Sequence, residues 1–365
     1  MKEIIKSKKY LLVISAFLFI VVFAIMQTPI YLLLLIIPIY FLFEKFKMKN
    51  IKVIIFVICL ALILSLLVFI IGKLNIIDYV KLFFKNHFNL NEMVLHFVNQ
   101  HYKPETASFI NFALFYHKDA NTMQFYHNLC DLNIIYLVSF SGLQVQLLFF
   151  IYSKIVKNKI ILKILNISTV ILLLLILNFT AAIIRIALYQ IIRLIFYKLN
   201  KYNILAISFI FVCFLGLKNV VNYGIDMSFF CTLAAFILID MKIKNKIIMM
   251  NFINLVLTLV CVPFVSYIDG KISFFSVLFG LFFQTYFSIL FILLLFLFPM
   301  YFLSFAFDSI GYFTENMIQC FNNLNIFIVI KFSPAITSIY FICLTLFITY
   351  LYRLWPHTFQ RKENC

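Results

Sequence analysis

Three short stretches place polar side chains inside long apolar runs, where such groups are costly unless they meet a partner or water. The first contains Ser141, Gly142, Leu143 and Gln144, so a glycine is flanked by a hydroxyl and an amide. A glycine in this setting permits close backbone approach or a break in a helix. The same composition is also typical of small-residue helix packing with hydrogen-bonded side chains, and the sequence leaves both readings open.

The second stretch begins at Asn178 and Thr180 and continues to Arg185, Tyr189 and Arg193. The last three residues are four apart, so they share one face of a helix. Two guanidinium groups with an aromatic ring between them suit a groove for single-stranded nucleic acid, since the cations bind phosphate and the ring stacks on any base. The alternative is that both arginines extend to opposite membrane interfaces, because each lies only about two turns from its end of the helix.

The third stretch contains Gly224, Asp226 and Ser228, so an acid enters an apolar run directly behind a glycine. Asp226 could pair with Arg185 or Arg193, and such a pair would neutralise charges that are expensive to bury in a membrane. It could equally lie at the outer interface.

The composition defines the elements that must position these residues. Of 365 residues, 65% are apolar and only 12% are charged, which excludes a water-soluble globule. The apolar residues form unbroken runs of about 17 to 22 and not the alternating segments of about 10 that barrel strands need. We therefore predict an all-α fold, a polytopic transmembrane helical bundle of about 10 to 12 spans, some of them short, broken or re-entrant. The apolar stretch 272–307 is expected to supply two of them, and 225–239 is an example of a short one.

The net charge of +17 is unevenly distributed, and this asymmetry predicts the membrane topology. Lysines cluster between apolar runs, whereas the long polar segment 73–131 has five lysines and five acids, a balance of zero. Under the positive-inside rule this places both termini of a multi-pass cell-membrane protein in the cytoplasm and 73–131 outside. The clusters are Lys2, Lys6, Lys8, Lys9; Lys45, Lys47, Lys49, Lys52; Lys154, Lys157, Lys159, Lys163; and Lys242, Lys244, Lys246.

Four segments follow from this pattern: a three-span region (1–72), an extracytoplasmic segment with amphipathic helices (73–131), a transmembrane core (132–307), and an amphipathic segment with the last span and a cytoplasmic tail (308–365). Five of the six histidines lie in the second segment, but their spacing matches no ligand motif, so we predict no metal. No nucleotide-binding loop, catalytic-serine motif or zinc-protease motif occurs. We expect no cofactor and no enzymatic activity.

In order, the three polar stretches resemble the motifs of the competence (ComEC-type) family of DNA-internalisation membrane proteins. The first family motif has the form His-Leu-Leu-x-Ile-Ser-Gly-Leu-His-Val. Residues 136–145 match it at Leu137, Ser141, Gly142, Leu143 and Val145. Both histidines are replaced, by Tyr136 and Gln144, and upstream Asn133 stands where a glycine is usual.

The second family motif, Gly-x-x-x-Ser-x-x-Arg-Ala, aligns with residues 178–186 and matches at Arg185, while Asn178 and Ala182 replace its glycine and serine. The third, Gly-Phe-Gln-Leu-Ser-Phe, aligns with residues 224–229 and keeps Gly224, Ser228 and Phe229. The resemblance covers about 114–240. Larger family members carry further external domains, and none fits in 73–131.

The resemblance implies a channel that passes single-stranded DNA through the membrane into the cytoplasm, with a separate DNA receptor, nuclease and cytoplasmic motor as partners. Its channel or DNA-contact residues would come from the three stretches above. Two alternatives remain: a secondary transporter or lipid-linked glycan flippase that uses an Arg/Asp pair, and a scaffold. The sequence leaves the oligomeric state open, including a homo-oligomer.

Overall fold

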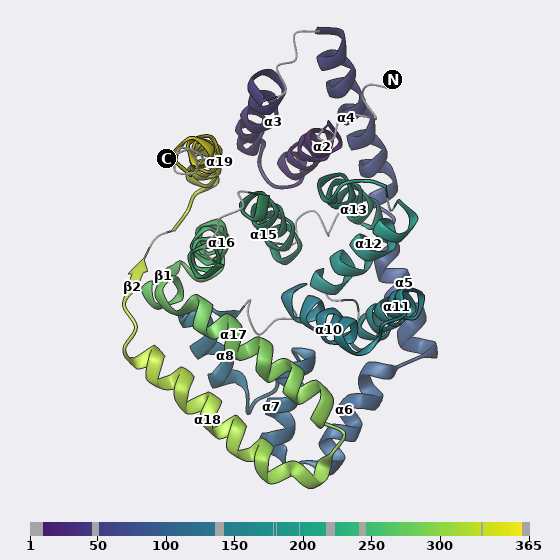
Figure 1. Cartoon of the computed structure of the whole chain (residues 1–365), viewed down its shortest axis with the longest axis vertical. Helices are drawn as coiled ribbons and strands as arrows, with labels where there is room; N and C mark the ends of the chain where they lie inside the picture. Colours follow the sequence, from purple (N-terminus) through teal and green to yellow (C-terminus); the bar gives the residue numbers. More distant parts are fainter. Residues whose placement is uncertain are drawn as a thin grey trace. The chain divides into compact units, whose positions relative to one another are not determined.

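The computed structural model describes residues 10–45, 51–135, 142–177, 179, 181–196, 198–216, 223–240, 246–329 and 331–359. Nearly all of these residues are helical, and the only strands among them are two of three residues each (Figure 1). The all-α prediction is confirmed. The chain divides into two compact units, each assembled from segments distant in sequence, and each is described by itself.

Unit 1 consists of residues 1–77, 192–267 and 331–365. Its elements are α2 (Tyr10–Met26), a 3-10 helix (Pro29–Leu35), α3 (Ile36–Tyr40), a π-helical turn (Phe41–Lys45), α4 (Ile51–Gly72), α13 (Lys201–Leu215), α15 (Tyr223–Asp240), α16 (Lys246–Asp269) and α19 (Pro334–Phe359).

Unit 2 consists of residues 78–191 and 268–330. Its elements are α6 (Leu90–His101), α7 (Pro104–Phe115), α8 (Met123–Asp131), α10 (Gly142–Ile155), α11 (Lys159–Ile176), β1 (Lys271–Ser273), α17 (Phe274–Leu297), a 3-10 turn (Tyr301–Leu303), α18 (Ser304–Asn323) and β2 (Phe327–Val329). The division falls within α5 (Ile76–His87) and α12 (Ala181–Ile195), and near the end of α16.

Local sequence signals explain several helix starts. The side chain of Asn158 accepts hydrogen bonds from the backbone N–H groups of Ile160 and Ile161 at the start of α11, and Asn200 accepts one from Asn203 at the start of α13. These amides satisfy donors that have no partner within the helix. Pro104 and Pro334 occupy the first positions of α7 and α19, where a proline removes no helical hydrogen bond.

Pro263 lies inside α16, where its missing N–H leaves the carbonyl of Leu259 without a helical donor. The hydroxyl of Tyr340, on α19, donates to that carbonyl at 2.8 Å. A side chain from a distant segment therefore repairs the break in the hydrogen-bond ladder, which explains how α16 continues for 24 residues through a proline.

Helical irregularity occurs at a different place from the one the sequence suggested. Residues 225–239, expected to be a short or broken span, belong to α15, a continuous helix of 18 residues. The second apolar run instead changes from 3-10 to α to π geometry between Pro29 and Lys45. Pro29 and Pro38 both lie within this stretch, and prolines interrupt the regular ladder.

The expectation of two spans in 272–307 is wrong. This stretch begins with β1 and continues as one helix, α17, for 24 residues. No proline occurs in this stretch before Pro299, and α17 ends two residues before it, as expected from the clash of a proline with the preceding turn. The chain then turns into α18, which lies beside α7 and α8 (Figure 1).

One large apolar cluster fills unit 2 and joins α7, α8, α10, α11, α12, α17 and α18. Its fully buried members include Phe109, Phe112, Leu129, Phe283 and Phe307. The prediction of amphipathic helices in 73–131 is confirmed for α5 and α6, but α7 is buried on all sides from Thr106 to Phe115.

Two described helices are long and apolar enough to cross a membrane, at Ile54–His87 and Lys159–Ile176. Several shorter apolar helices accompany them, among them Tyr10–Met26 and Lys201–Leu215. Only 11% of the most apolar window of α11 is buried, so it presents apolar side chains outward and differs from the core helix of a soluble protein.

Candidate functional site

Helix α12 carries three of the predicted site residues on one face, and their exposure increases along the helix. Arg185 is buried, with 7% of its surface exposed, Tyr189 is half-buried, and Arg193, in the last turn, is exposed. The neighbours of Arg185 along the helix, Ile183 and Ile186, belong to the apolar cluster of unit 2. The face therefore begins inside the protein and ends at its surface.

Gln144 is the described polar side chain of the first stretch, and it is 1% exposed near the start of α10. The adjacent Val145 and Leu148 belong to the same apolar cluster as Ile183 and Ile186. Gln144 and Arg185 thus both lie within the core of unit 2. An amide and a guanidinium thus lie beside residues of this apolar cluster, and both groups can donate hydrogen bonds.

Asp226 lies in the first turn of α15, in unit 1, and only 1% of its surface is exposed. In the part of the chain that the structure describes, neither carboxylate oxygen has a hydrogen-bond partner. Its carboxyl group interacts electrostatically with the thiol of Cys213 on α13. Asp226 is therefore not at an exposed interface, and its predicted pairing with Arg185 or Arg193 stays a prediction.

The remaining predicted site residues are placed less fully. Ser141, Asn178 and Thr180 lie outside the described residues. Gly142 and Leu143 begin α10, and Gly224 lies at the start of α15, but the surroundings of these three positions are not described. Ser228 is half-buried on α15, and its carbonyl accepts a hydrogen bond from Thr232 at 2.8 Å, which is a contact within the helix.

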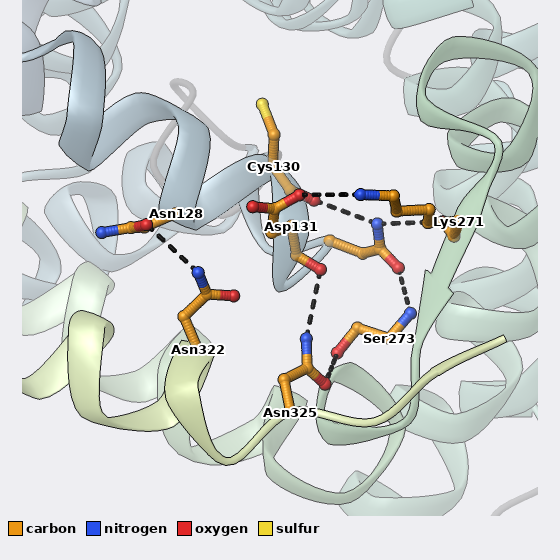
Figure 2. Close-up of polar contacts among 8 residues, drawn as sticks. Asn128, Cys130, Asp131, Lys271, Ser273, Asn322 and Asn325 are labelled. Carbon is orange, nitrogen blue, oxygen red and sulfur yellow. Dashed lines mark hydrogen bonds and ion pairs between the residues drawn. The ribbon is translucent and has the colours of Figure 1, made fainter. Parts of the chain in front are cut away.

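A polar junction that the sequence did not predict connects α8, β1 and α18 in unit 2 (Figure 2). Asn133 donates to the carbonyls of Cys130 (3.0 Å) and Lys271 (3.3 Å) and accepts from the backbone N–H of Ser273. The Ser273 hydroxyl donates to Asn325 at 2.8 Å, and Asn325 donates to the carbonyl of Asp131 at 3.3 Å. The Asn133 side chain thus bonds to the carbonyl of Lys271 and to the N–H of Ser273, as the backbone of a neighbouring strand would.

The backbone of Asn133 has a φ of 54°, in the left-handed region that favours glycine. After glycine, asparagine is among the residues most tolerant of this conformation. This observation gives a physical reason for an asparagine at a position where a glycine is also suitable. The sequence signal for the junction is this Asn after a helix, together with the asparagine-rich end of α18, Asn322 to Asn325.

A second polar contact joins the start of α7 to α18. Asp308 accepts hydrogen bonds from the hydroxyl of Thr106 and from Lys103, whose Nζ lies 2.9 Å from the carboxylate. These two hydrogen bonds, that from Thr106 first, lower the pKa of Asp308 below its ordinary value of 3.8. The bond to Asp308 in turn raises the pKa of Lys103.

Within the described residues, no three His, Cys, Asp or Glu side chains gather closely enough to hold a metal ion. The larger of two described surface hollows is apolar and lined by residues between Pro29 and Ile39, so it contains none of the predicted site residues. Comparisons with models of known protein families, with characterised proteins and with solved structures find no match to this chain.

Proposed function

We propose that this chain is a multi-pass membrane protein that passes single-stranded DNA into the cytoplasm. A polyanion cannot cross hydrocarbon without an enclosed polar path, and fixed cations lower the barrier along such a path. The proposed path follows the face of α12 with Arg185, Tyr189 and Arg193. Stacking on Tyr189 would tolerate every base, so sequence selectivity would lie in the separate receptor, with a nuclease and a cytoplasmic motor as further partners.

The observation that carries this proposal is the burial of Arg185. An arginine that extends to a membrane interface keeps its guanidinium in water. Arg193 fits that behaviour because it is exposed in the last turn of α12, but Arg185, at 7% exposure, does not. A buried guanidinium in so apolar a chain needs a polar or anionic partner, and buried ionisable groups in membrane helices mark substrate pathways.

The contacts of segment 73–131 support the topology on which the path depends. Asn91, in this segment, donates to the carbonyl of Ile176 at the end of α11, which the charge pattern places outside. Asn128 accepts from Asn322, and the Asp131 carbonyl accepts from Asn325, both in the segment before the last span. These residues pack together in unit 2, as expected if they share the outer face with both termini in the cytoplasm.

Within this topology, α17 does not cross the membrane. Residues at both of its ends contact the outer segment or the residues directly after it: Tyr102 donates to the carbonyl of Phe298 at 2.8 Å, and Asn133 bonds to Ser273. Because two predicted spans are removed together from 272–307, the number of spans stays even and both termini stay on the cytoplasmic side. We therefore propose ten spans, with α17 and α18 folded against the outer segment.

The test is DNA uptake by cells that lack this gene and carry Arg185→Leu, Arg185→Lys or Arg193→Leu copies. If Arg185 lies on the path, its leucine variant lowers the number of transformants at least tenfold, and the lysine variant restores part of the loss because it keeps the charge. Arg193→Leu removes the same group from the exposed end of the same face, and a smaller loss is expected there. Membrane levels are compared by immunoblot.

Normal transformation in the deletion strain would reject the proposal. Cysteine accessibility tests the topology separately. Ser309→Cys on α18 should react with an impermeant thiol reagent added outside, whereas Lys244→Cys should react only after the membrane is permeabilised.

Asp226 is buried and has no hydrogen-bond partner among the described residues, which favours a second candidate, a secondary transporter or a flippase for a lipid-linked glycan. This function predicts a flux of solute or lipid-linked sugar in reconstituted vesicles that is lost in Asp226→Asn and unchanged by added DNA. The channel proposal predicts DNA entry that depends on Arg185.

A further inference from the structure

The buried carboxyl of Asp226 is the least satisfied charged group among the described residues. It is 1% exposed, and neither oxygen accepts or shares a hydrogen bond. Its surroundings on α15 and α13 are apolar: Ile225 and Phe229 flank it along the helix, and the Phe229 ring packs edge-to-face on Phe209 of α13 at 4.8 Å.

An ionised carboxylate in such a place would lose its hydration and gain nothing in return, a cost far larger than that of burying a neutral carboxyl group. The positive end of the α15 dipole offsets only a small part of that cost. Among the described residues, the side chain of Cys213 interacts with Asp226, and its thiol provides no positive charge. A neutral form of the group is the one that fits this structure.

Asp240, at the other end of the same helix, shows the opposite arrangement. Its carboxylate receives Lys201 Nζ at 2.6 Å and the Tyr202 hydroxyl at 2.6 Å, and its side chain is 40% exposed. A cation, a donor and water therefore stabilise the ionised form of Asp240, whereas Asp226 is buried and receives no hydrogen bond from the described residues.

We propose that Asp226 is a proton-binding site inside unit 1. The ligand is a proton and not a metal ion, because a metal ion needs several oxygen or nitrogen ligands at once, and among the described residues this carboxyl belongs to no group of three His, Cys, Asp or Glu side chains and has no hydrogen-bond partner. Release of the proton would leave a bare carboxylate between α13 and α15, so the two helices must separate or admit water. A proton gradient can thereby act on this helix pair.

Infrared difference spectroscopy of the purified full chain in lipid tests this directly. We expect a C=O stretching band of a protonated carboxyl group at neutral pH, absent in Asp226→Asn and retained in Asp240→Asn. Asp226→Asn keeps the shape of the neutral group, so the melting temperature should be unchanged or higher. Absence of the band from the native chain, or a large fall in melting temperature, would show that Asp226 is ionised and paired, and would overturn the inference.

Carbodiimide labelling gives an independent readout. The carboxyl O–H adds across one C=N bond of dicyclohexylcarbodiimide: the oxygen bonds to carbon, the proton moves to nitrogen, and acyl migration gives a stable N-acylurea with no leaving group. We expect this apolar reagent to label Asp226 in preference to Asp240, and a water-soluble carbodiimide with an amine to show the reverse. Equal labelling of the two acids by both reagents would contradict the proposal. Neither experiment involves DNA, so failure of the proton-site inference and failure of the channel proposal are separate results.

Discussion

In unit 2, side chains from distant segments satisfy several carbonyls at helix ends, whereas one buried acid of unit 1, Asp226, has no hydrogen-bond partner among the described residues. Asn91 donates to the end of α11, Tyr102 to the residue after α17, and Asn325 to the end of α8. The last carbonyls of a helix have no partner within it. These contacts therefore fix helix ends in unit 2 and serve its structure.

Unit 1 is held mainly by apolar packing, in one cluster of α2 and α4 with Leu42 and another of α15, α16 and α19. Its clearest long-range polar contact inside the bundle, Tyr340 to Leu259, compensates for a proline. Against this background Asp226 is informative: a described side chain donates to the backbone carbonyl that the proline leaves without a donor, and none of the described residues donates to this carboxyl. The difference separates polar groups whose contacts stabilise the fold from one that makes no such contact with the described residues.

The largest expected effect is at Asn133, the centre of the unit 2 junction. Asn133→Val should lower the free energy of unfolding by about 4 kcal/mol, because a β-branched residue is strained at positive φ and three hydrogen bonds are lost. Asn133→Gly relieves the strain and loses only the bonds, so about 2 kcal/mol is expected. Denaturation of the purified chain in detergent measures both. Equal stability of the two variants would show that the left-handed backbone conformation costs nothing.

Tyr340 is the corresponding test for unit 1. Tyr340→Phe leaves the Leu259 carbonyl without a donor in apolar surroundings and should cost about 2 kcal/mol. Pro263→Ala provides a backbone N–H for that carbonyl, so in this background the same change should cost less than about 1 kcal/mol. A thermal double-mutant cycle measures the coupling. Additive effects would mean that the proline and the tyrosine are unrelated.

Tyr102 makes the same type of bond in unit 2, to the Phe298 carbonyl just beyond the end of α17. Tyr102→Phe should cost only about 1 kcal/mol, because Phe298 is half-buried and water can replace the hydroxyl in part. Comparison of its melting temperature with that of Tyr340→Phe sharpens the contrast between a helix end and a helix interior. A larger loss for Tyr102→Phe would reverse that ranking.

The features that the sequence predicted are local ones. Long unbroken apolar runs predicted helices, and Pro299 explains where α17 ends. The grouping of 78–191 with 268–330 was not predictable, because it depends on contacts such as Asn325 to Asp131, between residues 194 positions apart. Composition likewise could not reveal that 274–297 forms one continuous helix, since an apolar helix that packs on other helices has the same composition as a membrane span.

The same limit applies to the site. Helical spacing placed Arg185, Tyr189 and Arg193 on one face, but only the structure shows that Arg185 is buried and Arg193 exposed. Asp226 was expected either to be paired or to lie at an interface. Burial without a hydrogen-bond partner is a property of its three-dimensional neighbours, and no spacing in the sequence encodes it.

The smallest expected effect concerns the contact of Asp308 with Thr106 and Lys103, and it depends on pH. The pKa of Asp308 is lowered in the folded state, so its contribution to stability is fully present above the ordinary value of 3.8 and is lost as the pH falls through the lower, folded value. Asp308→Asn should cost roughly 0.5 kcal/mol at pH 7, because the side chain is partly exposed, and should cost nothing at the acid end. Melting temperatures of native and variant chains between pH 2 and pH 7 (about 1 unit per step) measure the difference.

Thr106→Val removes the first of the two hydrogen bonds and should reduce the pH dependence while Lys103 remains. Curves for the native chain and Asp308→Asn that stay parallel down to the acid end would show that Asp308 ionises alike in the folded and unfolded chain, and that this contact of unit 2 adds no stability.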